Sequence, residues 1–267
     1  MVKRSLCTFL SCLLLTGCGL IDYHPYDVRI DGETDVNAHN IEKIEANCKG
    51  KTTIRFVTLG DSQRWYDETE DFVKEINKRD DIDFVIHGGD VSDFGLTKEF
   101  LWQRDIMSGL KVPYVVLIGN HDCVGTGEET YKAVFGPTNF SFIAGNVKFV
   151  CLNTNALEYD YSEPVPDFTF MEKEVTARRE EFDKTVVSMH ARPYTDVFND
   201  NVAKVFQHYV NQYPGILFCT SAHTHHYLDE EIFNDGIHYV TSDCMDYRSY
   251  LVFTITPEGH SYELVKY

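Results

Sequence analysis

The 267-residue chain has few basic residues: 24 Lys and Arg stand against 42 Asp and Glu, which gives a formal net charge of -18. Such an acidic surface repels nucleic acid and anionic lipid headgroups, so we expect no nucleic-acid partner. An acidic protein that acts on an anionic substrate needs a local source of positive charge. Bound metal ions are one such source.

The chain also lacks an apolar run that is long enough to span a bilayer. Its first apolar run, residues 6–15, is short and follows Lys3 and Arg4, which is typical of a secretory signal peptide. The placement of Cys18 directly after Leu-Thr-Gly resembles a bacterial lipoprotein box. The resemblance implies that residues 1–17 are a lipoprotein signal peptide and that Cys18 is acylated. We therefore expect an extracytoplasmic protein that is lipid-anchored to a bacterial membrane, in the periplasm or at the cell surface; an ordinary signal peptide with an incidental cysteine is the alternative.

Cysteine pairs of the CxxC type are absent. Five cysteines remain after the targeting segment, an odd number at irregular spacing, which excludes a disulfide framework. One bridge, between Cys123 and Cys244 in predicted loops, stays open.

Two regions follow the signal peptide. Residues 18–51 are polar and acidic, and we interpret them as a tether, either free over its whole length or with its later part packed on the domain. Residues 52–267 are long enough for one domain with a full core.

Within this domain, short apolar runs alternate with amphipathic segments. The predicted strands are residues 54–59, 84–86, 112–118, 140–143, 147–152, 185–189, 216–219, 227–233, 237–241, 250–256 and 262–265. The predicted helices are residues 69–78, 97–107, 168–182 and 201–213. This alternation predicts an α/β layered fold with buried sheets.

Five of the predicted strands end in side chains that can bind metals. These side chains are Asp61 with Gln63, Asp90, Asn120 with His121, His190, and His223 with His225. Because strand carboxyl ends in layered α/β folds converge on one crevice, these residues can meet in space. Carboxylate oxygen, amide oxygen and neutral imidazole suit Mn, Fe and Zn, and such a set can hold two ions.

Taken singly, these residues also have simpler interpretations. Asp61 could cap a helix or fill a turn, and the Gly89–Asp90 pair is common in turns. His190 alone could be a hydrogen-bonded core histidine. The occurrence of all of them at strand ends favours the metal site.

The motifs also resemble a known family. Asp61-Ser62-Gln63, Gly89-Asp90-Val91-Ser92-Asp93, Gly119-Asn120-His121-Asp122, His190 and His223-Thr224-His225 are similar in order and spacing to the five sequence blocks of the calcineurin-like metallophosphoesterases. The resemblance covers most of residues 52–267. It implies a four-layer sandwich of two β-sheets flanked by helices, and metal-dependent hydrolysis of a small phosphomonoester or phosphodiester.

Carried over by position, the resemblance implies two metal sites that share Asp90. One ion would be held by Asp61, Gln63, Asp90 and His225, and the other by Asp90, Asn120, His190 and His223. A hydroxide bridging the two ions would attack phosphorus in line, and His121 would protonate the leaving oxygen or stabilise its charge. We expect Mn, with Fe or Zn as alternatives.

Two positions depart from the family pattern. Gln63 stands where the family usually has His, and an amide oxygen binds a metal more weakly than imidazole does. Ala222 stands where Gly is usual. The first departure keeps an alternative function open, namely a catalytically weak or inactive metal-binding lipoprotein of the same fold. A metal-dependent hydrolase of another ester class is a third hypothesis.

Neighbouring residues complete the predicted site. Arg64 and Arg192 could bind phosphate oxygens, and His226 could reach the substrate; the alternative is that all three lie on the surface. Asp122 could orient His121 or a ligand histidine from behind, and Asp93 could do the same or cap the following helix. We expect specificity to lie in four loops: residues 62–66, 122–130, 153–168 and 243–249.

Overall fold

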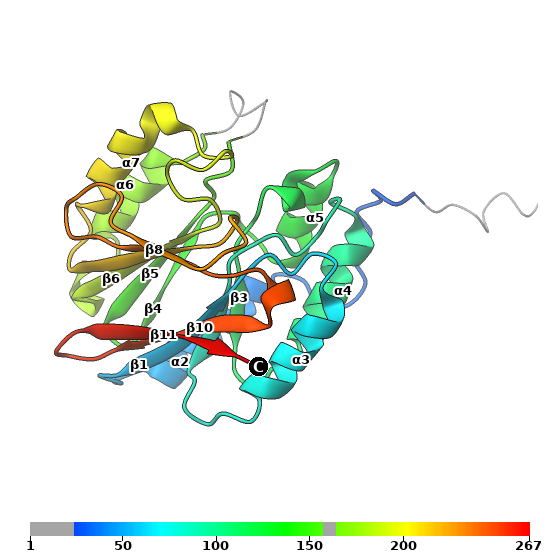
Figure 1. Ribbon diagram of the computed structural model, residues 1–267, viewed down its shortest axis with the longest axis horizontal. Coiled ribbons are helices and arrows are strands. Elements are labelled where there is room, and N and C mark those ends of the chain that lie inside the picture. The colour runs from blue at the N-terminus through cyan, green and yellow to red at the C-terminus, as the bar shows by residue number, and fades with distance from the viewer. Residues whose placement is uncertain (1–23, 157–163) are drawn as a thin grey trace, which may run out of the picture.

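Two mixed β-sheets pack face to face, and helices cover their outer faces (Figure 1). The computed structural model describes residues 24–156 and 164–267. The predicted signal peptide and Cys18 lie outside the described residues. In the described ranges, no helix combines the length and the apolar character that crossing a membrane requires.

The first sheet has five strands. In spatial order they are β11 (His260–Lys266), β10 (Ser249–Ile255), β1 (Ile54–Leu59), β2 (Phe84–His87) and β3 (Tyr114–Val116). Strands β1, β2 and β3 run parallel, and β10 joins β1 antiparallel. The carboxyl ends of the three parallel strands therefore lie at one edge.

The second sheet has six strands. In spatial order they are β4 (Phe140–Ala144), β5 (Val147–Leu152), β6 (Lys184–Met189), β7 (Ile216–Ser221), β9 (Tyr239–Thr241) and β8 (Leu228–Glu230). The four inner strands are parallel, and β4 and β8 are antiparallel edges.

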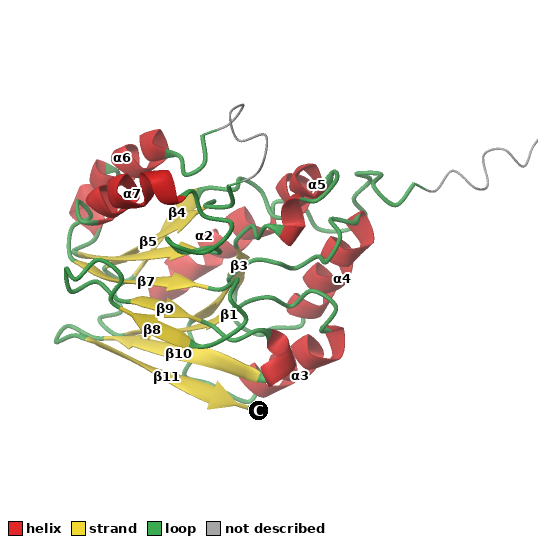
Figure 2. Cartoon of the chain, turned by 45° about the horizontal axis from the view of Figure 1, so that its top comes forward, coloured by secondary structure: helices red, strands yellow, loops and turns green. Residues whose placement is uncertain are grey.

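Three apolar clusters fill the spaces between the layers. Helices α3 (Tyr66–Ile76), α4 (Thr97–Met107) and α5 (Gly127–Val134) cover the first sheet, and α6 (Phe168–Thr176) and α7 (Ala203–Val210) cover the second (Figure 2). Stacked phenylalanines fill the space between the sheets, including Phe56 against Phe84 at a centroid distance of 5.3 Å. Because the inner strands are buried on both faces, their sequences are almost continuously apolar. The predicted four-layer sandwich is confirmed.

Helix α2 (Val36–Cys48) lies within the range assigned to the tether. It packs beside β3, where the Asn37 side chain donates to the Val116 carbonyl at 2.9 Å and accepts from the Val116 amide at 2.8 Å. The folded unit therefore begins before residue 52. The helix has little apolar periodicity because Asn37 and Asn40 occupy buried positions beside Val36, Ile44 and Cys48.

Other differences concern element ends. Helix α5 forms in a stretch predicted as loop, β3 is shorter than residues 112–118, and the helix from residue 168 ends at Thr176. Cys123 and Cys244 are buried and are not part of a disulfide, so the bridge left open between them is not formed.

Candidate metal centre

The carboxyl ends of the parallel strands from both sheets meet at one site. The His223 amide donates to Asp61 Oδ2 at 3.0 Å, and His190 Nδ1 donates to the Gly88 carbonyl at 2.8 Å. The backbone amide of Gln63 donates to the backbone carbonyl of Asp90 at 3.0 Å. These bonds join loops from different strands, so residues distant in sequence are brought together.

One group of donor atoms converges around Asn120. Its Oδ1 lies 3.0 Å from His190 Nε2 and 3.0 Å from His223 Nδ1. His190 Nε2 lies 3.4 Å from Asp90 Oδ2. Ligand atoms of Asp90, His190 and His223 all lie within 4.8 Å of one another. One carboxylate, one amide oxygen and two imidazoles form a donor set that suits Mn, Fe or Zn.

The partners of both imidazoles select the tautomer that a metal requires once the ring is neutral. His190 Nδ1 faces a backbone carbonyl and carries a proton, so in the neutral ring Nε2 is the lone-pair nitrogen. His223 Nε2 lies 2.6 Å from Asp196 Oδ1, which leaves Nδ1 toward Asn120. Partners of this kind fix the ring orientation of metal-binding histidines. Asp196 was not among the predicted site residues, and its exposed position in a loop gives no sequence signal.

Replacing Asp196 with Ala is expected to lower metal affinity by about 10- to 100-fold, because His223 loses the partner that fixes its tautomer. Calorimetric titration with Mn²⁺ measures this change. Asp196→Asn keeps an oxygen acceptor and should retain most of the affinity. Equal affinity in all three proteins would contradict the role.

The second group of donor atoms includes two buried oxygens without hydrogen-bond partners. Asp61 Oδ1 and Gln63 Oε1 have no such partner among the described residues. His225 Nε2 lies 3.5 Å from Asp61 Oδ1. Burying an acceptor without a partner costs about 1–3 kcal/mol, so these oxygens fit a cation. The residues present therefore suit a second metal ion.

Replacing Gln63 with His is expected to raise the metal content at limiting Mn²⁺, because imidazole is the stronger ligand. Elemental analysis of protein dialysed against graded Mn²⁺ tests this. An unchanged or lower content would show that the amide already suits the site.

Backbone strain is concentrated at the same place. Asp61, Arg64, Asp90, His223 and His225 have φ values of 53°, 60°, 58°, 71° and 62°. L-residues rarely adopt this conformation, and it occurs often at functional sites.

Two close approaches explain the small residues of the motifs. A Cβ on Gly119 would lie 2.0 Å from Asp90 Oδ1, so only glycine fits there. A Cβ on Gly60 would lie 2.5 Å from the Ala222 Cβ, and one on Gly88 would lie 2.9 Å from it. Ala222 is therefore accommodated because its neighbours are glycines.

Asp122 ties two ligand loops together. Its carboxylate accepts from the amides of Asp90 and Gly119, both at 2.9 Å, and from the Ser92 amide at 2.8 Å. Burial, and then the charge of Asp90, raises the pKa of Asp122 to about 7. Asp122 thus lies directly behind the metal ligands.

His121 and Asp93 are also in contact. His121 Nδ1 donates to the Asp93 carbonyl at 2.9 Å, and the His121 amide donates to Asp90 Oδ1 at 2.9 Å. The Asp93 carboxylate pairs with Arg64.

His87, the last residue of β2, is fully buried next to the ligand loops. Burial, and then repulsion from His190, lowers its pKa to about 3. Its Nδ1 accepts from the Gly89 amide at 3.2 Å, so its Nε2 donates to Ser62 Oγ at 2.8 Å. This neutral ring braces the loops that carry Asp61 and Asp90.

The stability of the metal-free protein is expected to fall as the pH rises above neutrality. Burial lowers the pKa of His190, but the charge and hydrogen bond of Asp90 outweigh it and raise the value from 6.5 to about 9. The stabilisation that protonated His190 gives through Asp90 is therefore complete below pH 6.5 and is lost as the pH rises through about 9. The raised pKa of Asp122 also makes stability fall with rising pH, but over a lower range. The folded protein favours the protonated carboxyl, and this contribution is lost between the ordinary pKa of 3.8 and about 7.

Metal binding requires neutral His190, so added Mn²⁺ should raise Tm by an increment that grows with pH over the same range. Thermal melts with and without Mn²⁺ measure both effects, and an increment that does not change with pH would contradict them.

A cavity of about 300 Å³ adjoins the metal ligands. Its lining residues are Gln63, Arg64, Trp65, His121, His225, His226, Cys244, Asp246 and Tyr247. The loops 62–66 and 243–249, predicted to control specificity, thus meet here. Arg64 and His226 reach this cavity. Arg192 does not line it, because its guanidinium pairs with Glu230 on β8.

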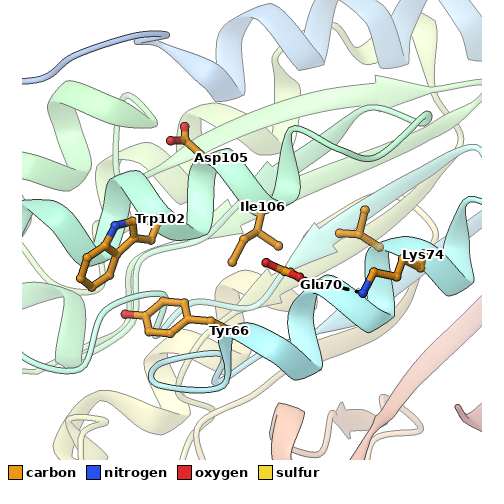
Figure 3. Close-up of a pocket in the computed structure, with 7 residues that line it drawn as sticks. Tyr66, Glu70, Lys74, Trp102, Asp105 and Ile106 are labelled. Atoms are coloured by element: carbon orange, nitrogen blue, oxygen red, sulfur yellow. Dashed lines mark ion pairs between the residues drawn. The ribbon is translucent and has the colours of Figure 1, made fainter.

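A larger cavity, of about 720 Å³, lies between α3 and α4 (Figure 3). The rings of Tyr66 and Trp102 meet edge to face at its end, and Glu70 pairs with Lys74 along its wall. None of the predicted site residues lines it. The smaller cavity is therefore the one that adjoins the predicted metal ligands.

A family model for the calcineurin-like phosphoesterases matches residues 54–227. The chain belongs to this family. The matched range contains all seven predicted metal ligands and His121. Comparison with curated proteins finds no match.

Solved structures share the calcineurin-like fold at low sequence identity. A dimetal phosphatase from Danio rerio has a TM-score of 0.58 and 10% identity, covering 80% of this chain and 99% of its own. The protein TT1561 of Thermus thermophilus has a TM-score of 0.56 and 12% identity, with coverage of 80% and 99%. GAP50, the anchor in the inner membrane complex of Plasmodium, has a TM-score of 0.58 and 12% identity, with coverage of 81% and 85%.

Proposed function

We propose that this phosphoesterase hydrolyses phosphate monoesters or diesters with two divalent metal ions. The observation that carries the proposal is the pair of unpartnered buried oxygens on Asp61 and Gln63. They lie beside a second donor set on Asn120, His190 and His223. Asp90 belongs to both sets.

The metal ions, when bound, supply a hydroxide nucleophile near neutral pH and neutralise charge on the phosphoryl oxygens. The residues of the chain would bind the ions and donate the proton. Asp61, Gln63, Asp90 and His225 would hold one ion, and Asp90, Asn120, His190 and His223 the other. His121 donates from Nδ1 to the Asp93 carbonyl, so its Nε2 is the nitrogen that delivers a proton to the leaving oxygen.

Arg64 and His226 line the adjoining cavity, and we assign to them contacts with the ester. Arg192 is held by Glu230 and receives no such role. We further propose that a lipid on Cys18 anchors the protein to a bacterial membrane. Mass spectrometry of the N-terminal peptide from a membrane fraction tests the anchor, and an unmodified Cys18 would exclude it.

The deciding experiment combines elemental analysis with hydrolysis of an aryl phosphomonoester and the matching phosphodiester after Mn²⁺ addition. Close to two ions per chain with hydrolysis supports the proposal and ranks the two ester classes. One ion or none, with no hydrolysis of either ester, would instead favour the inactive metal-binding protein. Gln63 is the observation that favours this second function.

A further inference from the structure

The cavity beside the metal ligands is where the alcohol part of a substrate would lie. His121, His225 and Gln63 contribute to its lining, so an ester whose phosphoryl group is at the metal centre extends into it. The inference therefore rests on the proposed function. The remaining lining differs in character from the metal ligands, because it combines aromatic rings with an acidic group.

Three aromatic residues contribute to this lining: Trp65, His226 and Tyr247. The rings of His226 and Tyr247 have centroids 5.5 Å apart and are inclined by 59°, so they form a corner rather than a parallel stack. Tyr247 is 45% exposed, so much of it stays accessible. The faces of Trp and Tyr rings attract cations, and aromatic cages are a known way to bind quaternary ammonium groups.

The charges of the lining favour the same kind of ligand. Among the described residues, Arg64 is the only Lys or Arg that lines the cavity, and its guanidinium pairs with the Asp93 carboxylate. The Asp246 carboxylate has no hydrogen bond or ion pair with any residue of the described ranges. The Asp246 carboxylate is therefore not paired with a basic side chain of the lining, in a chain whose net charge is already -18. A second anionic group on the substrate would be repelled there.

We propose that the preferred substrates are phosphate esters of an amino alcohol, in which a cationic ammonium group enters the cavity. Asp246 would oppose the ammonium charge, and Trp65, His226 and Tyr247 would surround its alkyl groups. The anionic phosphoryl end of such a substrate would bind at the metal centre. Its cationic alcohol end would bind in the cavity.

The test compares esters that differ only in this charge. Choline phosphate is paired with 3,3-dimethylbutyl phosphate, its neutral isostere, and the p-nitrophenyl diesters of the same two alcohols form a second pair. The wild-type enzyme is expected to show a kcat/KM about 10-fold higher for the cationic member of the pair that it hydrolyses. The preference should weaken with added salt, because exposed charges are screened.

Two variants test whether the cavity residues cause the preference for the cationic ester. Asp246→Asn and Tyr247→Leu should each reduce the preference for the cationic ester several-fold. Glu258→Gln, in the turn between β10 and β11, removes the same charge far from the cavity and should keep the full preference.

Equal rates for the paired esters, or a preference that survives both variants, would overturn the inference while leaving the phosphoesterase intact. Faster hydrolysis of nucleoside phosphates than of either pair would also overturn it. If p-nitrophenyl phosphate and all the paired esters resist hydrolysis, the proposed function fails as well.

Discussion

Replacing Asp90 with Asn is expected to remove hydrolysis almost completely, with a loss in kcat/KM of about 10³-fold or more. Asp90 is the one residue that the proposal assigns to both donor sets. Its Oδ2 lies 3.4 Å from His190 Nε2, and its Oδ1 accepts the His121 amide at 2.9 Å. Asn keeps the shape and one acceptor oxygen for that amide, but it removes the negative charge that two cations would share.

The metal content of Asp90→Asn should fall below that of the wild type, to one ion or none. Asp83→Asn is the matched control, because Asp83 precedes the same strand at its opposite end and pairs with Lys51 there. This control should keep both metals and full turnover. Two tightly bound ions and wild-type rates in Asp90→Asn would refute the shared-ligand assignment.

The sequence contains enough information for the centre of the site but not for its periphery. The ligands follow apolar strands whose burial makes them recognisable, and parallel strands place their carboxyl ends together. Asp61 and His223 could therefore be predicted as neighbours although 162 positions separate them. A resemblance in five ordered motifs adds the family, which the match over residues 54–227 shows.

The periphery depends on loop conformation and on side chains that find distant partners. Arg192 follows a ligand position, yet Glu230 on β8 holds it away from the cavity. Asp196 lies in a loop with no periodic pattern, yet it contacts His223. Neither pairing has a local signal, because each arises only when the loops are folded.

Two helices were missed for a related reason. Helix α2 buries Asn37 and Asn40 through hydrogen bonds and close packing, so its inner face does not look apolar. Helix α5 begins at Gly127 and buries only Tyr131 and Val134 as large apolar groups. Hydrophobic periodicity detects a face that is buried by the hydrophobic effect, and it fails where polar groups satisfy the same positions.

Replacing His121 with Ala is expected to lower kcat by about 10²- to 10⁴-fold, because a positioned proton donor contributes that much. Metal content should not change, since His121 belongs to neither donor set. Its side chain is 37% exposed and lines the cavity, so the substitution removes a reacting group and little packing.

The loss should depend on the leaving group, and this separates proton donation from mere positioning. An alkoxide is a poor leaving group and needs the proton, whereas p-nitrophenolate leaves without one. His121→Ala should therefore reduce hydrolysis of an alkyl phosphate much more than hydrolysis of p-nitrophenyl phosphate. Equal losses for both esters, with both metals still bound, would mean that His121 stabilises phosphoryl charge. Its hydrogen bond to the Asp93 carbonyl would then serve to direct a charged ring at the phosphoryl group.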